Sequence, residues 1–421
     1  MICHFLLTLA FAAPAPAPAS PAQNWPQWRG VHNDGHSPAK GLPVEWGPDK
    51  NIVWKFDMPG RGASTPCIWG GNIFLTSIDG PDVVLMCVGT DGKEKWKRKL
   101  ASGAKAGYRG AEGDDASASC STDGQHVWAY AGTGILGCFD FDGKPVWELD
   151  LQKYGKYNIQ FGCHWTPVLY KGRIYTQVMH RNVELVLALD ALTGKEIWKV
   201  EGKGVGRKGT ESPDVYASAF MWEGEGGPLL ITHGNDTCAA HKLDDGAEVW
   251  RVEELNPTKD KNWRFVSSPL VSPKLIVVPS CKGGPTVGIN PVGAKGSIDP
   301  KNSAELWRLN FTPDVVSPLL IDDIVYLLKD GPLYAIDAKT GKQIYEKQLG
   351  AKQIYRGHMV AADGKIFIVG REGIALVVQA GKEFKILGTS DLKDLTYASP
   401  AIAGDRLYIR TWKHLYCIGA K

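Results

Sequence analysis

Several features that define common functional classes are missing from this sequence of 421 residues. Its 48 basic and 45 acidic residues leave a formal net charge of only +3, so we expect no nucleic-acid partner and no strong attraction to membranes. No G-x-S-x-G elbow, Walker element or H-E-x-x-H motif occurs. The cysteines contain no C-x-x-C pair and no zinc-ligand spacing. The sequence therefore carries none of these catalytic or metal-binding signatures.

The apolar run at the N-terminus is short. Phe5–Ala13 has the length of a signal-peptide core and is too short to span a bilayer, so we expect no transmembrane segment. The Ala/Pro tract Ala12–Ala22 supplies small residues for cleavage and then a spacer. Met1–His4 contains no Lys or Arg, which leaves a mis-assigned start or an uncleaved anchor as alternatives. We expect residues 1–22 to export the chain to the periplasm or the cell exterior.

An internal repeat is the most informative feature that is present. Leu187–Trp198 reads LALDALTGKEIW, and Leu333–Tyr345 reads LYAIDAKTGKQIY. A Ser/Pro pair and two apolar runs precede such segments, as in Ser317–Leu328. The same plan recurs, with shorter turns or more divergence, at Leu85–Trp96, Leu136–Trp147 and Cys238–Trp250.

The repeats predict a β-propeller. Their spacing of roughly 40–50 residues suits propeller blades, and period-2 alternation predicts four strands, A to D from the centre outwards. We predict an all-β, eight-bladed propeller of four-stranded blades over residues 51–421, after a lead-in at 23–50. Seven blades is the alternative, because the repeat around Ile366–Leu387 is degenerate. The eight repeats begin near Ser64, Ser117, Trp165, Ala217, Ser267, Ser317, Gly357 and Ala398.

The two ends of the chain predict how the ring closes. The last repeat, Ala398–Lys421, has no D strand, whereas Asn51–Asp57 has a D strand's tryptophan and no C strand before it. We therefore expect the N-terminal strand to complete the last blade, which removes open sheet edges. Glycines such as Gly194 and Gly341 should supply the positive φ of the C-to-D turn. The predicted D-strand aromatics, which would pack between blades, are Trp54, Trp96, Trp147, Trp198, Trp250, Trp307, Tyr345 and Phe384, the last in the poorest register.

The repeat register also accounts for most cysteines. Cys87, Cys138 and Cys417 occupy the small C-strand position that Ala188 and Ala335 hold in other repeats. Cys67 and Cys120 share one A-strand position. We expect these thiols to be buried small residues rather than redox groups, because no charged neighbour recurs beside them to lower their pKa.

The element L-x-A-x-D-x-x-T-G-K-x-x-W resembles the tryptophan-docking repeat of the pyrroloquinoline quinone (PQQ)-like propeller family. Leu187–Trp198 and Leu333–Tyr345 match it nearly position for position, and the stretch from Trp25 to Gly30 (WPQWRG) is similar to the lead-in of exported members. The family includes PQQ-dependent alcohol dehydrogenases and the outer-membrane assembly factor BamB, which is not an enzyme. The resemblance implies the fold strongly and the function weakly, because the repeat is a packing device.

The sequence departs from both kinds of relative. The dehydrogenases resembled here characteristically carry two adjacent cysteines against the quinone, and this chain has no Cys-Cys pair. No Glu, Asn and Asp set can be assigned to chelate calcium beside the quinone. BamB is a lipoprotein, and no cysteine follows the apolar leader here in a lipobox-like stretch. Sugar-oxidising members also lack the adjacent cysteines, so PQQ with calcium stays a possible cofactor.

Candidate binding residues lie at the start of each blade. The D-to-A and B-to-C connections should share one face, and the side chains just before each A strand should lie nearest the central axis. A funnel of mixed charges and aromatics there could hold a small anionic ligand or a peptide. A simpler interpretation is that these side chains solvate the mouth of a channel, and His164 and His358 then ligate no metal. The predicted set is Arg61, Asp115, His164, Tyr216, Arg264, Asp314, Arg356, His358 and Tyr397.

Three hypotheses follow for function. The first is an exported, non-enzymatic, BamB-like binding or scaffold platform, a monomer that presents its loop face to an envelope protein or a small anionic ligand. The second is a PQQ-dependent oxidoreductase acting on alcohols or sugars. The third is a carbohydrate-facing module, suggested by Tyr154, Tyr157 and Trp263 in the D-to-A loops. No catalytic residue is assigned under any of them.

Overall fold

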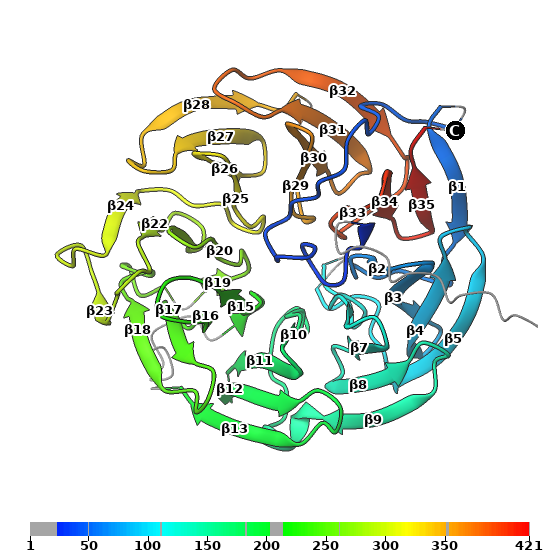
Figure 1. Cartoon of the computed structure of the whole chain (residues 1–421), viewed down its shortest axis with the longest axis horizontal. Helices are drawn as coiled ribbons and strands as arrows, with labels where there is room; N and C mark the ends of the chain where they lie inside the picture. Colours follow the sequence, from blue (N-terminus) through cyan, green and yellow to red (C-terminus); the bar gives the residue numbers. More distant parts are fainter. Residues whose placement is uncertain are drawn as a thin grey trace, which may run out of the picture.

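The computed structural model describes residues 23–48, 50–109, 112–181, 183–202, 214–260, 262–350 and 353–420. The predicted leader and spacer, residues 1–22, lie outside the described residues. Eight four-stranded antiparallel units surround a central axis as the blades of a propeller (Figure 1). The prediction of eight blades is confirmed, and the seven-bladed alternative is wrong.

The blades follow one another along the chain. Blade 1 contains β2 (Cys67–Trp69), β3 (Asn72–Asp79), β4 (Asp82–Gly89) and β5 (Glu94–Ser102), and blade 2 contains β6 (Ser121–Thr122), β7 (His126–Tyr130), β8 (Ile135–Asp140) and β9 (Pro145–Asp150). Blade 3 contains β10 (Val168–Tyr170), β11 (Arg173–His180), β12 (Val183–Asp190) and β13 (Glu196–Glu201), and blade 4 contains β15 (Phe220–Trp222), β16 (Leu229–Gly234), β17 (Thr237–Lys242) and β18 (Glu248–Val252). Blade 5 contains β20 (Leu270–Val271), β21 (Ile276–Pro279), β22 (Thr286–Ile289) and β24 (Glu305–Leu309), and blade 6 contains β25 (Leu319–Ile321), β26 (Ile324–Leu328), β27 (Pro332–Asp337) and β28 (Gln343–Gln348). Blade 7 contains β29 (Val360–Ala362), β30 (Lys365–Val369), β31 (Ile374–Gln379) and β32 (Ile386–Asp391), and blade 8 contains β33 (Ala401–Ala403), β34 (Arg406–Arg410), β35 (His414–Ile418) and β1 (Ile52–Asp57).

The N-terminal strand closes the ring. Strand β1 pairs antiparallel with β35, with Trp54 opposite Cys417, as the ends of the sequence predicted. Three smaller elements complete the structure. They are the parallel pair β14 (Asp214–Val215) and β19 (Arg264–Phe265), the short 3₁₀ helix η2 (Leu151–Tyr154), and β23 (Gly296–Ile298), which adds a parallel fifth strand to blade 4.

Burial along the strands explains their sequence patterns. The second strand of blade 1, β3, is buried at every position except its two ends, because neighbouring blades cover both faces of the sheet. Its buried positions, Ile73 to Ile78, therefore follow one another without the alternation of a half-exposed strand, and Thr76 and Ser77 are buried among them. The outermost strands β1 and β9 have only one covered face, and their exposure alternates with period 2. The core thus consists of layers between blades.

One contact repeats from blade to blade. The D-strand tryptophan lies opposite a small C-strand residue of its own blade, as Trp147 does opposite Cys138 and Trp198 opposite Ala188. The indole then packs on the C-to-D turn glycine of the next blade, and its Nε1 donates to a carbonyl there. Trp147 packs on Gly194 and donates to the Ala191 oxygen at 2.9 Å. The equivalent glycines are Gly92 beneath Trp54, Gly143 beneath Trp96, Gly246 beneath Trp198 and Gly341 beneath Trp307.

The docking prediction was wrong in blade 7. Strand β32 begins after Phe384, and the residue opposite Val377 in the docking register is Gly388. A Cβ at Gly388 would lie 2.2 Å from the Val44 oxygen, because the lead-in packs directly on this position. The lead-in therefore takes the space that an aromatic side chain fills in the other blades. Phe384 instead packs edge-to-face on Tyr345 at 5.8 Å between ring centroids.

The lead-in crosses the centre of the ring. Its backbone pairs with blade 1, where the Trp25 amide donates to Ile68 at 2.9 Å, and with blade 7, where the Ser37 amide donates to Ala361 at 2.9 Å. The dark blue segment in Figure 1 follows this path from the axis out to β1. These contacts lie at the ends of the A strands, on the side of the short A-to-B and C-to-D turns. We call that side the turn face and the opposite side the loop face.

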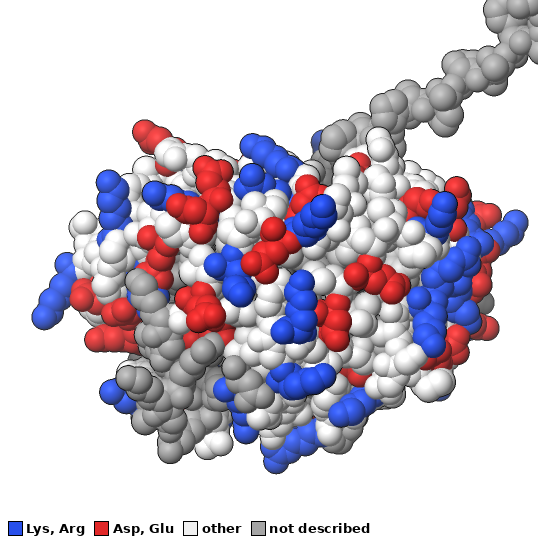
Figure 2. All heavy atoms as spheres, turned by 90° about the horizontal axis from the view of Figure 1, so that it is seen from below, with Lys and Arg blue, Asp and Glu red and all other residues white. Residues whose placement is uncertain are grey.

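The cysteines are buried, as the repeat register predicted, and the surface charges are of mixed sign. All eight cysteines of the described residues are free and buried. Burial raises the pKa of Cys417 to about 11 and the pKa values of Cys87 and Cys138 to about 12. Charges of both signs are interspersed over the side of the ring seen in Figure 2. No helix among the described residues is long and apolar enough to cross a membrane.

The docking contact predicts a difference between two glycine substitutions. Gly194 has φ of 67°, and an added Cβ would lie 2.7 Å from the Trp147 ring, whereas Gly172 has φ of 75° and open space around it. Gly172→Ala should cost only backbone strain, about 1 kcal/mol, and Gly194→Ala about 2–4 kcal/mol because overpacking is added. Urea denaturation of both variants measures this difference. Equal losses of unfolding free energy would contradict the proposed packing of Trp147 on Gly194. We call this contact between a D-strand tryptophan and the turn glycine of the next blade the joint.

Candidate functional site

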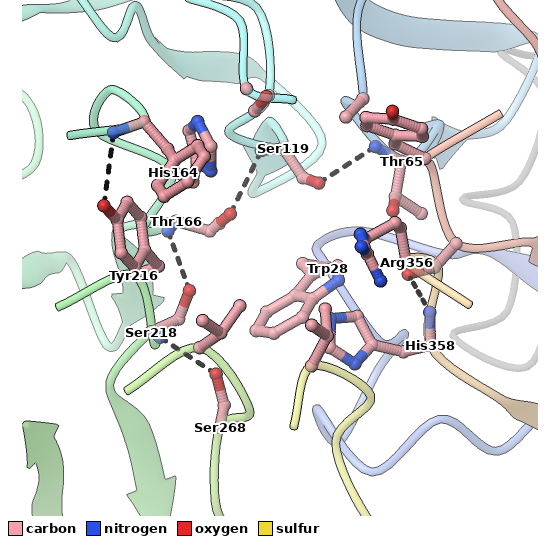
Figure 3. A pocket seen from close by; sticks show the side chains of 18 of the residues that line it. Trp28, Thr65, Ser119, His164, Thr166, Tyr216, Ser218, Ser268, Arg356 and His358 are labelled. Carbon is pink, nitrogen blue, oxygen red and sulfur yellow. Dashed lines mark hydrogen bonds between the residues drawn. The ribbon is translucent and has the colours of Figure 1, made fainter. Parts of the chain in front are cut away.

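A cavity of about 240 Å³ opens on the loop face at the central axis. Its walls come from the segments just before the A strands, and its floor is the Trp28 indole of the lead-in (Figure 3). Seven of the nine predicted site residues line it: His164, Tyr216, Arg264, Asp314, Arg356, His358 and Tyr397. The sequence argument therefore placed these side chains correctly at one mouth. Their role in binding stays a prediction.

A chain of hydrogen bonds runs around this cavity. At the start of the A strand in blades 1 to 7, a backbone amide donates to the side chain at the same position of the next blade, over distances of 2.7–3.0 Å. The side chains are hydroxyls in every blade except blade 7. Each bond satisfies an amide that has no strand partner at this point and ties two blades together. In order, the bonds join Thr65, Ser119, Thr166, Ser218, Ser268, Ser317, His358 and Ser399.

His358 replaces the hydroxyl in blade 7. The Ser317 amide donates to its Nδ1 at 2.7 Å, so Nδ1 is unprotonated and the neutral ring carries its proton on Nε2. Burial and the nearby positive charge of Arg29 lower the pKa of His358 to about 3, which keeps the ring neutral. The imidazole packs edge-on to Trp28 at 4.9 Å between ring centroids. The prediction that His358 ligates no metal is consistent with this use of Nδ1.

The floor of the cavity spans the channel. Trp28 contacts His358 of blade 7 on one side and Phe220 of blade 4 on the other, with ring centroids 5.6 Å apart in the second pair. Behind it, the guanidinium of Arg29 is buried and donates to the Pro318 carbonyl at 2.9 Å. The lead-in thus gives the cavity an aromatic base that no blade supplies.

One wall gathers three polar side chains around Phe161. The Arg264 guanidinium lies 5.1 Å from the Phe161 ring centroid and donates to Gln160 at 3.2 Å. The Tyr216 hydroxyl accepts from the Phe161 amide at 3.2 Å, which leaves its own proton free to donate. The His164 ring lies 5.5 Å from that of Tyr216, and its Nε2 has no hydrogen-bond partner. Burial lowers the pKa of His164, so the ring is neutral at pH 7.

The opposite wall is neutralised by an ion-pair cluster. Arg356 donates to both carboxylate oxygens of Glu112 at 3.2 Å, and Arg371 approaches the same carboxylate at 3.5 Å. Asp330 lies 3.7 Å from Arg356. Because these charges pair with one another, Arg264 is the cavity guanidinium that has no acidic partner among the described residues. The charged side chains of this wall are therefore fixed by their ion pairs and are not free to bind a ligand's charge.

Two predicted site residues do not line the cavity. Arg61 lies 3.7 Å from Asp114, with its guanidinium 4.0 Å from the centroid of the Trp412 ring. Asp115 is 1% exposed and accepts from the Tyr108 hydroxyl at 2.6 Å and the Lys105 amide at 2.7 Å. It holds the 101–116 loop in place, and burial raises its pKa. Both positions were misjudged because loop conformation decides which of two neighbouring side chains faces the axis.

Sequence reasoning missed four kinds of cavity residue. It assigned Trp28 to the lead-in without a role, and it overlooked Glu112, Phe161 and the ring of hydroxyls. The Ser or Thr that recurs at the start of each A strand was a visible signal for the ring. Nothing in the sequence signalled Trp28 or Glu112, because both reach the cavity through segments outside the repeat.

The aromatic side chains proposed for carbohydrate contact are largely enclosed. Trp263 is 5% exposed, and the Tyr157 hydroxyl accepts a hydrogen bond from Tyr130 at 2.9 Å. Tyr154 donates to Glu196 at 2.6 Å. Trp263 is therefore not available as a platform, whereas Tyr154 and Tyr157 are half-buried.

Comparison with known proteins identifies the family. The model of the family described as outer membrane protein assembly factor BamB matches residues 182–421. The chain belongs to this family. The protein named outer membrane protein assembly factor BamB from Yersinia pestis is 23% identical over 299 residues, which cover 68% of this chain and 69% of that protein. The one from Moranella endobia (strain PCIT) is 25% identical over 295 residues, or 66% and 68% of the two chains.

Solved structures share the propeller fold across the BamB family and the quinone enzymes. BamB from Moraxella catarrhalis superposes with a TM-score of 0.63 at 13% identity, covering 88% of this chain and 97% of that one. The quinohemoprotein alcohol dehydrogenase from Comamonas testosteroni gives 0.70 at 13% identity, covering 96% and 82%. At these identities the likeness concerns the fold alone. The PQQ-like propeller predicted from the repeat is confirmed.

The cavity offers few acidic side chains for a calcium–quinone pair of the dehydrogenase kind. Calcium takes six to eight oxygen ligands, and no group of three or more Asp, Glu, His or Cys side chains among the described residues could hold a metal ion. Glu112 is already paired with Arg356 and Arg371. With Arg356 paired to Glu112, Arg264 is the cavity guanidinium without an acidic partner among the described residues, against the three carboxylates that PQQ carries.

The hydroxyl ring predicts a stability effect. Ser218→Ala leaves the Thr166 amide buried without an acceptor, which should lower the free energy of unfolding by about 1–3 kcal/mol. Ser218→Thr keeps the hydroxyl and should recover most of that loss. Urea denaturation of the two variants measures both values. A Thr variant as unstable as the Ala variant would show that side-chain volume, and not the hydrogen bond, decides stability here.

His358 predicts a pH dependence. Its pKa is lowered from 6.5 to about 3 on folding, so its contribution is complete above pH 6.5 and is lost as the pH falls towards 3. His358→Asn offers an amide oxygen to the Ser317 amide and cannot titrate. Between pH 6.5 and 4.5 the variant should lose about 1–2 kcal/mol less unfolding free energy than the native protein. Denaturation at the two pH values tests this. If the native protein and the variant lose the same unfolding free energy between these pH values, the lowered pKa of His358 does not contribute to the pH dependence.

Proposed function

We propose that this protein is a non-enzymatic binding platform of the cell envelope that takes part in outer membrane protein assembly. The membership of the chain in the family described as outer membrane protein assembly factor BamB supports this role. Both relatives above are named for it. The apolar N-terminal run supports export to the periplasm or cell exterior, as argued from the sequence.

The observation that carries the proposal is the pairing pattern in the cavity. Its hydroxyls accept bonds from backbone amides, and none of the described ones is hydrogen-bonded to an imidazole nitrogen. Nucleophilic catalysis needs a base in such contact with the nucleophile. The site instead offers a rigid rim, an aromatic floor and the unpaired Arg264. These features suit recognition of a group that enters from a partner.

Arg264 defines the chemistry of that group. A carboxylate can accept two parallel bonds from a guanidinium, and the Tyr216 hydroxyl can donate a third. We propose that the loop face receives an acidic side chain of an envelope protein or a small anionic ligand at this wall. His164, Asp314, Arg356, His358 and Tyr397 shape the remaining boundary, with Arg61 and Asp115 holding the loops behind it.

Genetic complementation tests the proposal in cells that encode the protein. Loss of the gene should reduce the folded fraction of outer membrane β-barrel proteins, and the native gene should restore it. Arg264→Glu reverses the charge at the proposed contact and should restore it poorly. Lys144→Glu, an equal charge reversal in an exposed turn-face position, is the matched control and should restore it fully. Immunoblots of the folded envelope pool check that both variants accumulate equally.

Two results would distinguish the assembly role from a PQQ-dependent oxidoreductase. Unchanged β-barrel folding after gene loss would contradict the assembly role. Calorimetric titration of PQQ, with and without calcium, into protein expressed without residues 1–22 should give no saturable heat. Binding near one PQQ per chain would contradict the non-enzymatic proposal and restore the oxidoreductase hypothesis.

A further inference from the structure

Two connections on the turn face break the regularity of the blades. The A-to-B turn of blade 4 spans residues 223–228, where blade 3 uses only 171–172. The C-to-D connection of blade 5 spans residues 290–304, where blade 3 uses 191–195. Neither extension is needed to connect its two strands, because shorter turns connect the corresponding strands in the other blades. Extended loops on a rigid scaffold are where binding sites are commonly built.

The two extensions meet at one groove of about 710 Å³, which lies within the range of ligand-binding pockets. The first extension contributes Gly226, Gly227 and Pro228, and the second contributes the stretch from Pro291 to Lys295. The facing wall comes from the A-to-B turn of blade 3 and the C-to-D turn of blade 4, residues 242–244. The groove is on the opposite face from the cavity and shares no residue with it.

The second extension is held in a fixed position. Its strand β23 pairs with the edge of blade 4, with Ile298 opposite Val252 and fully buried (Figure 1). The Ser297 hydroxyl donates to Glu253 at 3.0 Å, and Asn302 donates to the Ser297 carbonyl at 2.8 Å. The groove is therefore preformed, so binding of a ligand does not include the entropic cost of ordering its walls.

The extension replaces the usual joint between blades 4 and 5. Trp250 is fully buried in the docking register opposite Ala240, yet among the described residues its Nε1 has no hydrogen-bond partner and no turn glycine lies against its ring. An unpaired buried donor costs free energy, about 1–3 kcal/mol. This unfavourable contact lies beside the groove. Such departures from the repeat are expected where a segment serves binding rather than stability.

The lining combines apolar surface with positive charge. Leu229, Val249 and the Tyr170 ring provide the apolar part. The groove also contains four cationic and two acidic side chains, so two positive charges are in excess: Lys171, Arg173, Lys242 and Lys295 against Glu225 and Asp244. Lys242 and Lys295 are exposed and form no ion pair with the described residues, while Arg173 donates to the Leu243 carbonyl at 2.9 Å.

We propose that this groove binds an extended acidic peptide segment of a partner protein. The excess positive charge selects acidic side chains, and the apolar part of the lining can accommodate an aliphatic residue of the same segment. This site goes beyond the proposed loop-face function and does not depend on it. A propeller with one site on each face can hold two partners at once.

Fluorescence anisotropy with a synthetic peptide tests the proposal. The probe is a labelled peptide in which Glu alternates with Leu, and the protein is the chain without residues 1–22. Saturable binding at low salt that weakens as salt rises is expected. The double variant Lys242→Glu/Lys295→Glu should weaken binding about tenfold or more, because two attractive contacts become repulsive.

The matched control is Lys144→Glu/Lys339→Glu, which reverses two exposed charges in the C-to-D turns of blades 2 and 6. It should change affinity less than about twofold. Equal weakening by both double variants would overturn the proposal, as would equal binding of a peptide in which Lys alternates with Leu. Displacement of the probe by inorganic tripolyphosphate at equal concentration would also overturn it in favour of a general anion site. Thermal unfolding confirms that both variants are folded.

Discussion

The packing of a tryptophan on the turn glycine of the next blade is the interaction on which the rest of the structure depends. It joins consecutive blades with buried apolar area, a hydrogen bond and a turn that only glycine adopts without strain. Trp54 makes the same contact with Gly92 from the N-terminal strand, so the ring closes with the joint used elsewhere. A closed ring completes the last blade and leaves only short outer strand edges, and it fixes the positions of the connections at the two faces.

The contact is missing at two places where segments outside the repeat are inserted. In blade 7 the lead-in packs on Gly388 and then continues across the axis to place Trp28 beneath the cavity. Between blades 4 and 5, the 290–304 extension leaves Trp250 unpaired and builds the turn-face groove. The repeats supply a stiff frame, whereas the two exceptions supply the surfaces proposed to bind.

The two faces differ in how their charges are arranged. On the loop face, the ring hydroxyls accept hydrogen bonds and Arg356 is paired with Glu112, whereas Arg264 has no acidic partner among the described residues. On the turn face, Lys242 and Lys295 are exposed and form no ion pair with the described residues, and the groove they line also has apolar side chains. The loop face therefore suits one well-placed acidic group, and the groove suits a longer acidic segment. This division is compatible with an assembly factor that holds more than one partner.

The sequence by itself determined what the repeat encodes. Four strands per blade, eight blades, closure by Trp54, the buried thiols and the ring of pre-A-strand residues all follow from local periodicity and from glycine and tryptophan spacing. It also allowed His164, Tyr216, Arg264 and Arg356 to be placed at one mouth, because every blade delivers the same register position to the axis. Only the tertiary structure decided that Gly388 replaces Phe384 in the docking register, that Asp115 faces inward and that Trp28 forms the floor. The first and third arise from contacts between segments about two hundred residues apart or more, and the orientation of Asp115 arises from the conformation of its own loop. The repeat pattern encodes neither.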